Sequence, residues 1–140
     1  MKRCCVAIVL IFASTALCQE GDGKAVQGTW KPMSAEFAGA KFPEAQLKAM
    51  TLVLTDGKYT VTVGEAVDKG TFKFDDKANP KSLDIVGMEG PNKGKTMLAI
   101  YELKGDTLRV CYDIAGKTRP TKFETSKELP FFLAVYRRDK

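Results

Sequence analysis

The sequence predicts a mainly β fold, an antiparallel up-and-down barrel of about eight strands with one short helix between the first two strands. Short runs alternate between apolar and polar residues, and clusters of Gly, Asp, Asn and Pro separate these runs. Such alternation buries one face of each strand, and about eight strands joined by hairpins can close into a barrel without exposed edges. The strands are expected at residues 26–35, 51–55, 58–64, 68–75, 82–87, 96–104, 107–114 and 131–138, and residues 121–124 offer a further short strand.

Turn residues support this order of strands. Asp56-Gly57 and Gly105-Asp106 each lie between two alternating runs, and both pairs supply the positive φ that tight hairpin turns need. A longer polar turn contains Pro80, which cannot donate a hydrogen bond to a central strand. The first two turns therefore predict hairpins, and the third predicts a wider loop.

One segment, residues 43–50, has helical character. Pro43 suits the first turn of a helix, and Glu44 suits the positive end of the helix dipole. The helix belongs to the connection that runs from Phe37 to Met50, and we expect this connection to act as a lid if the barrel holds a ligand.

Alternation also assigns side chains to the barrel interior. The strand at residues 96–104 is an exception because it is apolar on both faces, so we expect a loop, a helix or a partner to cover Leu98 and Ile100. In the other strands the inward positions are Trp30, Leu52, Leu54, Tyr59, Val61, Val63, Phe72, Phe74, Leu83, Ile85, Leu108, Val110, Tyr112, Leu133 and Val135.

The first 18 residues have the layout of a secretory signal peptide, with a basic start and an apolar stretch that ends in small residues. The apolar stretch spans 15 residues from Cys4 to Cys18, whereas a membrane-spanning helix needs about 20, so we expect no stable membrane span. Cleavage after Ala16 or after Cys18 fits, and acylation of Cys18 fits less well because Leu17 occupies a position that favours small residues. We therefore expect a secreted or periplasmic protein.

The predicted division of the chain is a signal peptide at 1–18, a flexible N-terminal segment at 19–25 and a barrel domain at 26–140. The whole chain carries 22 Lys and Arg against 17 Asp and Glu, a formal charge of +5, and loss of the two basic residues in 1–18 reduces it to +3. Basic and acidic residues alternate, as on a solvated surface, so we expect no nucleic-acid partner. The mature chain keeps one cysteine, Cys111, and can form no intrachain disulfide. The oligomeric state stays open.

Several motifs resemble a known family. Gly28-Thr29-Trp30 in the first strand, a short helix in the next loop, a run of hairpins and an Arg near the end of the last strand resemble the lipocalin and calycin barrels. The resemblance implies that Trp30 lies at the closed end of the barrel and that Arg137 or Arg138 packs across its indole. On this basis we assign barrel closure to Gly28, Trp30 and Arg137.

The chain is more closely similar to a group of secreted lipocalin-like domains of unknown function that is abundant in planctomycete bacteria. The similarity covers nearly the whole mature chain, but it implies a fold and no particular activity. Its pattern is carried by Gln27-Gly28-Thr29-Trp30, Pro43-Glu44, Gly70-Thr71-Phe72-Lys73, Gly90-Pro91-Asn92-Lys93-Gly94-Lys95-Thr96, Ile100-Tyr101-Glu102-Leu103, Gly105-Asp106-Thr107-Leu108 and Arg119-Pro120-Thr121-Lys122-Phe123.

The candidate ligand-binding residues are Trp30, Tyr59, Phe72, Tyr112 and Arg119. Aromatic side chains are typical of barrel pockets, and the hydroxyls of Tyr59 and Tyr112 and the guanidinium of Arg119 are the polar groups that could anchor a ligand. The interior of an eight-stranded barrel is just wide enough to be filled by side chains or to hold one small ligand. Both outcomes are compatible with the sequence.

Two functions follow from these outcomes. A binding module would hold a small, partly apolar molecule in a void behind the connection 37–50. An envelope protein-interaction or structural module would have a filled barrel, no ligand and an exposed apolar patch near Leu98, Ile100, Phe131 and Phe132.

The sequence offers few residues that could carry out catalysis. The chain contains no histidine, which excludes histidine-based catalysis and histidine metal sites. Residues 90–96 resemble a phosphate-binding P-loop, but three residues separate the glycines instead of four and a strand follows instead of a helix, so we interpret them as a hairpin loop. Cys111 lies in the middle of a strand without an activating base, which favours a structural role. We expect no catalytic residues, no metal and no cofactor.

Overall fold

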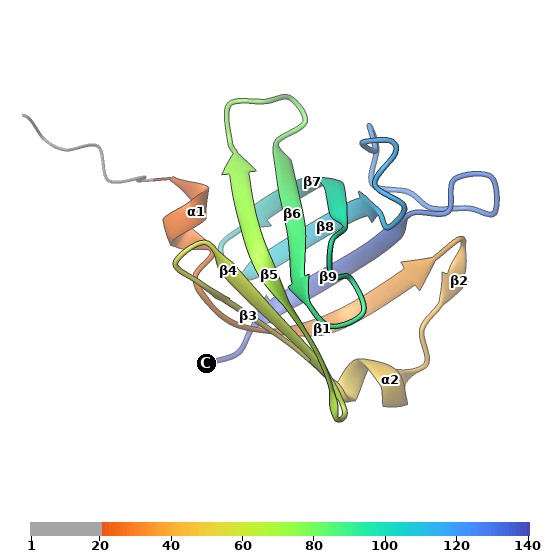
Figure 1. The fold of residues 1–140 in the computed structure, drawn as a ribbon, viewed down its shortest axis with the longest axis horizontal. Coiled ribbons are helices and arrows are strands. Elements are labelled where there is room, and N and C mark those ends of the chain that lie inside the picture. The colour runs from red at the N-terminus through yellow and green to blue at the C-terminus, as the bar shows by residue number, and fades with distance from the viewer. Residues whose placement is uncertain (1–20) are drawn as a thin grey trace, which may run out of the picture.

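The computed structural model describes residues 21–140, so the predicted signal peptide, its cleavage sites and Cys18 lie outside the described residues. The described chain is a succession of strands with two short helices, α1 (Asp22–Ala25) and α2 (Glu44–Lys48) (Figure 1). The strands are β1 (Gly28–Phe37), β2 (Ala40–Lys41), β3 (Met50–Thr55), β4 (Lys58–Val63), β5 (Ala66–Asp75), β6 (Ser82–Glu89), β7 (Thr96–Lys104), β8 (Thr107–Asp113) and β9 (Phe132–Arg138).

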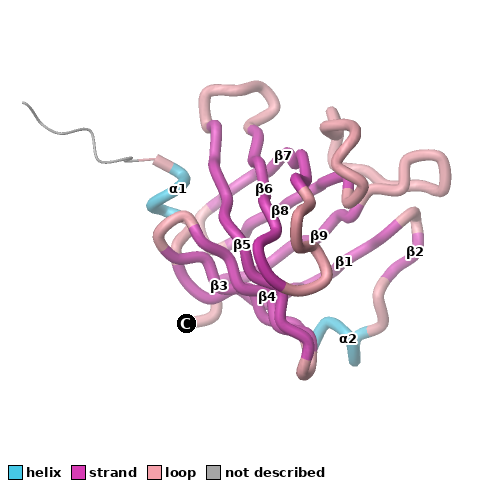
Figure 2. The backbone as a smooth tube through the Cα atoms, viewed as in Figure 1, coloured by secondary structure: helices cyan, strands magenta, loops and turns pink. Residues whose placement is uncertain are grey.

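The sheet closes on itself. From β3 to β9 each strand pairs antiparallel with the next, and β1 pairs with both β3 and β9, so the eight long strands form a barrel (Figure 2). Gly28 to Trp30 pair with β3, and Trp30 to Phe37 pair with β9. The two-residue strand β2 only adds a hairpin to the end of β1. The predicted mainly β, up-and-down barrel with a short helix after the first strand is confirmed.

The predicted strands and turns agree with the structure to within about two residues. Asp56 and Gly57, with φ of 51° and 76°, connect β3 to β4, and Gly105, with φ of 55°, connects β7 to β8. Both predicted hairpins are therefore confirmed. Residues 121–124 form no strand.

One end of the barrel is closed by Trp30 and Arg138. The Trp30 side chain has no exposed surface, and its indole N–H donates a hydrogen bond to the Val26 carbonyl at 2.8 Å. The Arg138 guanidinium lies 4.4 Å from the centre of the indole ring and donates hydrogen bonds to the Gln27 carbonyl and, at 2.7 Å, to the Ala25 carbonyl. The chain that enters β1 is thus held across the end of the barrel.

The assignment of this closing role to Arg137 was wrong, and the phase of the last strand is the reason. Residues Phe132, Ala134 and Tyr136 face the main core, whereas the prediction placed Leu133 and Val135 there. Arg138 is in register with Trp30 across the β1–β9 ladder, so its side chain is on the same face, and Arg137 is exposed. This strand is apolar on both faces, so alternation alone did not determine its phase.

The segment between β8 and β9, residues 114–131, covers the outer face of β7 and β8. Ile100 and Cys111 are 1% and 0% exposed there, packed with Phe131 and Phe123 in a small second core. The predicted covering of the doubly apolar strand is confirmed, and the cover is a loop. The exposed patch expected of a filled barrel is not found, because Ile100, Phe131 and Phe132 are buried and Leu98 is half-buried.

The segment predicted to be flexible, 19–25, contains the helical turn α1. The Asp22 carboxylate accepts hydrogen bonds from the Tyr101 hydroxyl at 2.7 Å and from the Lys81 ammonium at 2.8 Å. Burial raises the pKa of Asp22, but the hydrogen bonds from Lys81 and Tyr101 outweigh it and lower the pKa below its usual value. These contacts attach the turn to β7 and to the β5–β6 loop.

Replacement of Arg138 by Ala should lower the free energy of unfolding by about 2 kcal/mol, because hydrogen bonds from a charged group and the stacking on Trp30 are lost. The matched control is Arg137→Ala, which removes an exposed side chain and should change stability by less than about 0.5 kcal/mol. Urea denaturation followed by the fluorescence of Trp30, the one tryptophan of the chain, measures both. Equal losses in the two variants would contradict the assignment.

Candidate functional site

The interior of the barrel contains a cavity of about 230 Å³. Its walls are mainly apolar and come from strands β3 to β9, with two residues from the β6–β7 loop. The volume exceeds the ~150 Å³ of engineered apolar cavities that bind benzene. The sequence left open whether side chains fill the interior or leave room for a small ligand, and the described barrel contains a cavity. The lining residues are Leu52, Leu54, Tyr59, Val61, Val63, Asp68, Phe72, Phe74, Leu83, Ile85, Pro91, Asn92, Met97, Leu108, Val110, Tyr112 and Tyr136.

Three of the five predicted binding residues line this cavity, namely Tyr59, Phe72 and Tyr112. Trp30 does not line it, because it is buried at the closed end under Arg138. The prediction for Trp30 as a ligand contact was therefore wrong, while Trp30 and the Arg138 guanidinium have the stacked geometry that the family resemblance implied.

Arg119 does not reach the cavity either, so its prediction as a ligand anchor was wrong. It belongs to the segment 114–131, which lies outside the barrel, and its guanidinium donates hydrogen bonds to the carbonyls of Leu83 and Ala99 at 3.3 and 2.8 Å. It also pairs with the Asp84 carboxylate. Through these contacts Arg119 connects the outer segment, residues 114–131, to the β6–β7 ladder.

The polar centre of the cavity is Asp68, which the sequence analysis did not single out. Asp68 is only 8% exposed and lies opposite Val61 in the β4–β5 ladder. It occupies the same face of β5 as Phe72 and Phe74, since the irregularity between β5 and β6 places the extra residue, Met88, on β6. The signal was present in the alternation of residues 68–74, which puts Asp68 in phase with Phe72 and Phe74, but the prediction assigned Asp68 to neither face.

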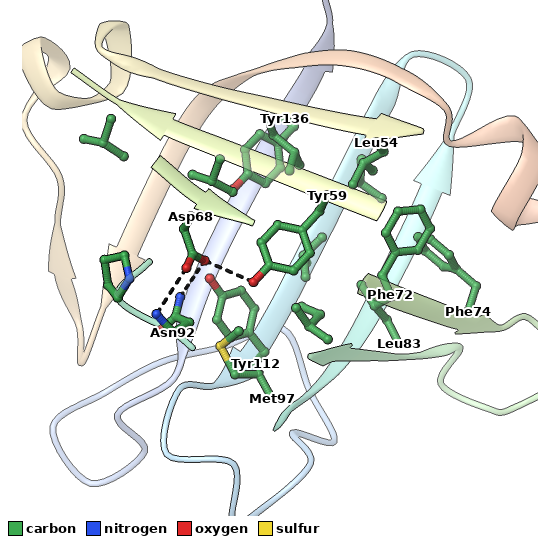
Figure 3. A pocket seen from close by; sticks show the side chains of 17 residues that line it. Leu54, Tyr59, Asp68, Phe72, Phe74, Leu83, Asn92, Met97, Tyr112 and Tyr136 are labelled. Atoms are coloured by element: carbon green, nitrogen blue, oxygen red, sulfur yellow. Dashed lines mark hydrogen bonds between the residues drawn. The ribbon is translucent and has the colours of Figure 1, made fainter. Parts of the chain in front are cut away.

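Asp68 accepts three hydrogen bonds, and all come from neutral donors (Figure 3). The Tyr59 hydroxyl donates to Oδ2 at 3.1 Å, the Asn92 side-chain amide donates to Oδ2 at 2.9 Å, and the Asn92 backbone N–H donates to Oδ1 at 3.1 Å. These hydrogen bonds join Asp68 of β5, Tyr59 of β4 and Asn92 of the β6–β7 loop at one end of the cavity.

The loop that supplies Asn92, residues 90–95, makes up most of the P-loop-like stretch 90–96, and the structure confirms that it is a hairpin loop followed by strand β7. It packs closely on β5, because a Cβ at Gly90, where φ is 90°, would lie 2.9 Å from the Asp68 Cα. Glycine is required at this position for both reasons. The loop is also held by the hydrogen bond from the Gly94 N–H to the Gly87 carbonyl at 2.9 Å.

Two further hydroxyls face the cavity. Tyr112 and Tyr136 line the cavity, Tyr136 is 6% exposed, and neither hydroxyl has a hydrogen-bond partner within residues 21–140. In Figure 3 the Tyr112 hydroxyl points toward Asp68 and Tyr59. Burial raises the pKa of both tyrosines well above the usual value, and for Tyr112 the charges of neighbouring groups, Asp68 among them, add to it. Both hydroxyls therefore stay protonated and able to donate or accept.

The connection expected to act as a lid takes a different place. None of residues 37–50 lines the cavity, whereas Pro91 and Asn92 do. Phe42 in this connection packs edge-on against Phe132, with ring centres 5.7 Å apart. The loop 90–95, rather than the connection 37–50, is the part of the described chain that borders the cavity from beyond the strands.

Comparison with known proteins gives no family assignment, because no protein-family model, no curated protein and no solved structure matches the chain. Neither of the two helices within residues 21–140 is long and apolar enough to cross a membrane. In the same range no three acidic or cysteine side chains come together in a group that could hold a metal ion. The site must therefore be interpreted from its own geometry.

Cys111 lies in the second core and outside the cavity lining, and its thiol faces the Glu124 carbonyl at 3.7 Å. Burial raises the pKa of the thiol to about 11. Since the thiolate is the reactive form, about one molecule in a thousand would carry it at pH 8.

Cys111 should therefore react with Ellman's reagent at pH 8 at least a hundredfold more slowly in the folded protein than in 6 M guanidinium chloride, because both burial and the raised pKa protect it. The reaction is followed by absorbance on the mature protein, which has no other cysteine if cleavage follows Cys18. Rapid labelling of the folded protein would show that the second core opens.

Proposed function

We propose that this protein is a secreted or periplasmic lipocalin-like barrel that binds a small, partly apolar molecule in its cavity. The observation that carries this proposal is the combination of apolar walls with two cavity-facing hydroxyls, those of Tyr112 and Tyr136, that lack protein partners. Each hydroxyl is open to the cavity and can therefore take a hydrogen-bond partner from a bound molecule. A ligand with one polar group would supply it while its apolar part covers the walls.

The size of the cavity supports a small ligand. A volume of about 230 Å³ is below the ~300 to 1,000 Å³ of typical drug-sized sites. A molecule with one ring and a short chain suits it better than a long acyl chain. Each 100 Å² of apolar surface that such a ligand buries would contribute about 2.5 kcal/mol before the cost of association.

Export and family membership belong to the same proposal. The basic start and the 15-residue apolar stretch of the leader support secretion, with ordinary cleavage preferred to acylation of Cys18. The eight-stranded barrel closed by Trp30 and Arg138 is compatible with a lipocalin-like fold. We propose binding without catalysis, because the cavity presents no pair of nucleophile and base.

Replacement of Ile85 by Trp should abolish ligand binding, because Ile85 lines the cavity and the larger side chain would fill it. The matched control is Val86→Trp, the next residue of β6, whose side chain points out of the barrel. Native mass spectrometry of the mature protein purified from its own host is the measurement. The wild type and the control should carry an added small-molecule mass that is lost on denaturation, and Ile85→Trp should not.

Two results would contradict the proposal. A bare wild-type protein at the mass of the mature chain would argue for a barrel without a ligand. An added mass that survives in Ile85→Trp would place the bound molecule outside the cavity.

A further inference from the structure

The cavity has a net negative charge. Of its lining residues only Asp68 carries a formal charge at neutral pH, and neither Lys nor Arg contributes a side chain to the walls. The raised pKa values of Tyr59, Tyr112 and Tyr136 keep these hydroxyls neutral. An anionic ligand would therefore meet repulsion from Asp68 and no compensating cation.

Asp68 also has no counter-ion within the part of the chain that the structure describes. The ion pairs within residues 21–140 involve other carboxylates, namely those of Asp22, Glu44, Asp84, Glu102 and Asp106. The three donors to Asp68 are a hydroxyl, an amide and a backbone N–H, and none of them offsets its charge. A buried carboxylate without a cation is costly, so a cation in the cavity would find a favourable position beside it.

The groups around Asp68 fit an ammonium in particular. An ammonium carries three donors, and Asp68 and the oxygens of Tyr112 and Tyr136 are acceptors among the residues that line the cavity. A guanidinium would need a flat pair of acceptors, which a carboxylate already bonded through both oxygens offers less well.

The opposite part of the cavity is apolar. Phe72 lies four residues from Asp68 along β5, about 13 Å at the usual rise of a strand, and packs edge-on against Phe74 with ring centres 5.1 Å apart. In Figure 3 these two rings and Leu83 lie together, away from Asp68 and Asn92. The cavity is therefore polar and negative at one end and aromatic at the other.

We propose that the ligand is a small amphiphilic amine, protonated at neutral pH, with its ammonium beside Asp68 and an apolar body directed toward Phe72. This inference rests on the proposed binding function and names the ligand class of the same site. It assigns Asp68, with Tyr112 and Tyr136, as the determinants of specificity. Neutral apolar molecules of the same shape would bind more weakly, and carboxylates would not bind.

Isothermal titration calorimetry at pH 7 tests the proposal with three probes that share one aromatic body: 2-phenylethylamine, 2-phenylethanol and phenylacetate. The amine should bind the wild-type protein at least tenfold more tightly than the alcohol, because a charge-assisted hydrogen bond replaces a neutral one. Phenylacetate should show no binding. This comparison needs no variant, so it stands even if a substitution disturbs the fold.

Asp68→Asn then tests the assigned residue, because it removes the charge and keeps an acceptor for Asn92. The amine should lose its tenfold advantage, and the affinity of the alcohol should change less than threefold. The matched control is Glu65→Gln, which removes one exposed negative charge in the β4–β5 turn near the same end of the barrel and should leave all three affinities unchanged. Circular dichroism of each variant checks the fold.

The outcomes separate the two proposals. Equal affinities for amine and alcohol, or tighter binding of phenylacetate, would overturn the amine inference while leaving small-molecule binding in place. Amine preference that persists in folded Asp68→Asn would overturn the role of Asp68. Failure of all three probes to bind would count against both the inference and the proposed function.

Discussion

The pairing of β1 with two different neighbours is the constraint on which the rest of the barrel depends. Its first residues, Gly28 to Trp30, pair with β3, and the remainder pairs with β9, so that Trp30 belongs to both ladders. This double pairing removes the free edges that β3 and β9 would otherwise expose. It also brings Arg138 opposite Trp30, which is why the closing side chains meet at this end.

The same geometry makes the two ends of the barrel unlike. Beyond Trp30, β1 follows β9 and no longer pairs with β3, and α2 packs against both β1 and β3. Phe42 is held there by the hydrogen bond from its N–H to the Ala35 carbonyl at 2.9 Å. The end that carries α1 is sealed by Arg138, whereas the cavity extends toward Asp68 and the loop that carries Asn92. The Asp68 carboxylate therefore lies at the end of the barrel interior that the side chains leave unfilled.

Alternation predicted most of the architecture because most strands have one apolar and one polar face. It failed for β9, where consecutive apolar residues from Phe132 to Tyr136 satisfy either phase, and this one ambiguity misplaced both the inward residues and the closing arginine. Arg119 was misassigned for another reason. Nothing in the sequence around it indicates that residues 114–131 lie outside the barrel and cover Ile100.

The sequence by itself determined the strand order, the hairpins and the inward positions of Tyr59, Phe72 and Tyr112, because these depend on local turn chemistry and on a period of two. Only the tertiary structure decided that a void remains between those side chains, since the space left inside a barrel depends on how all strands pack together. Tertiary structure likewise joined Asp68 to Asn92, 24 residues apart, by folding a loop over β5. The charge of the cavity is that of Asp68, because no Lys or Arg of residues 21–140 is among the lining residues.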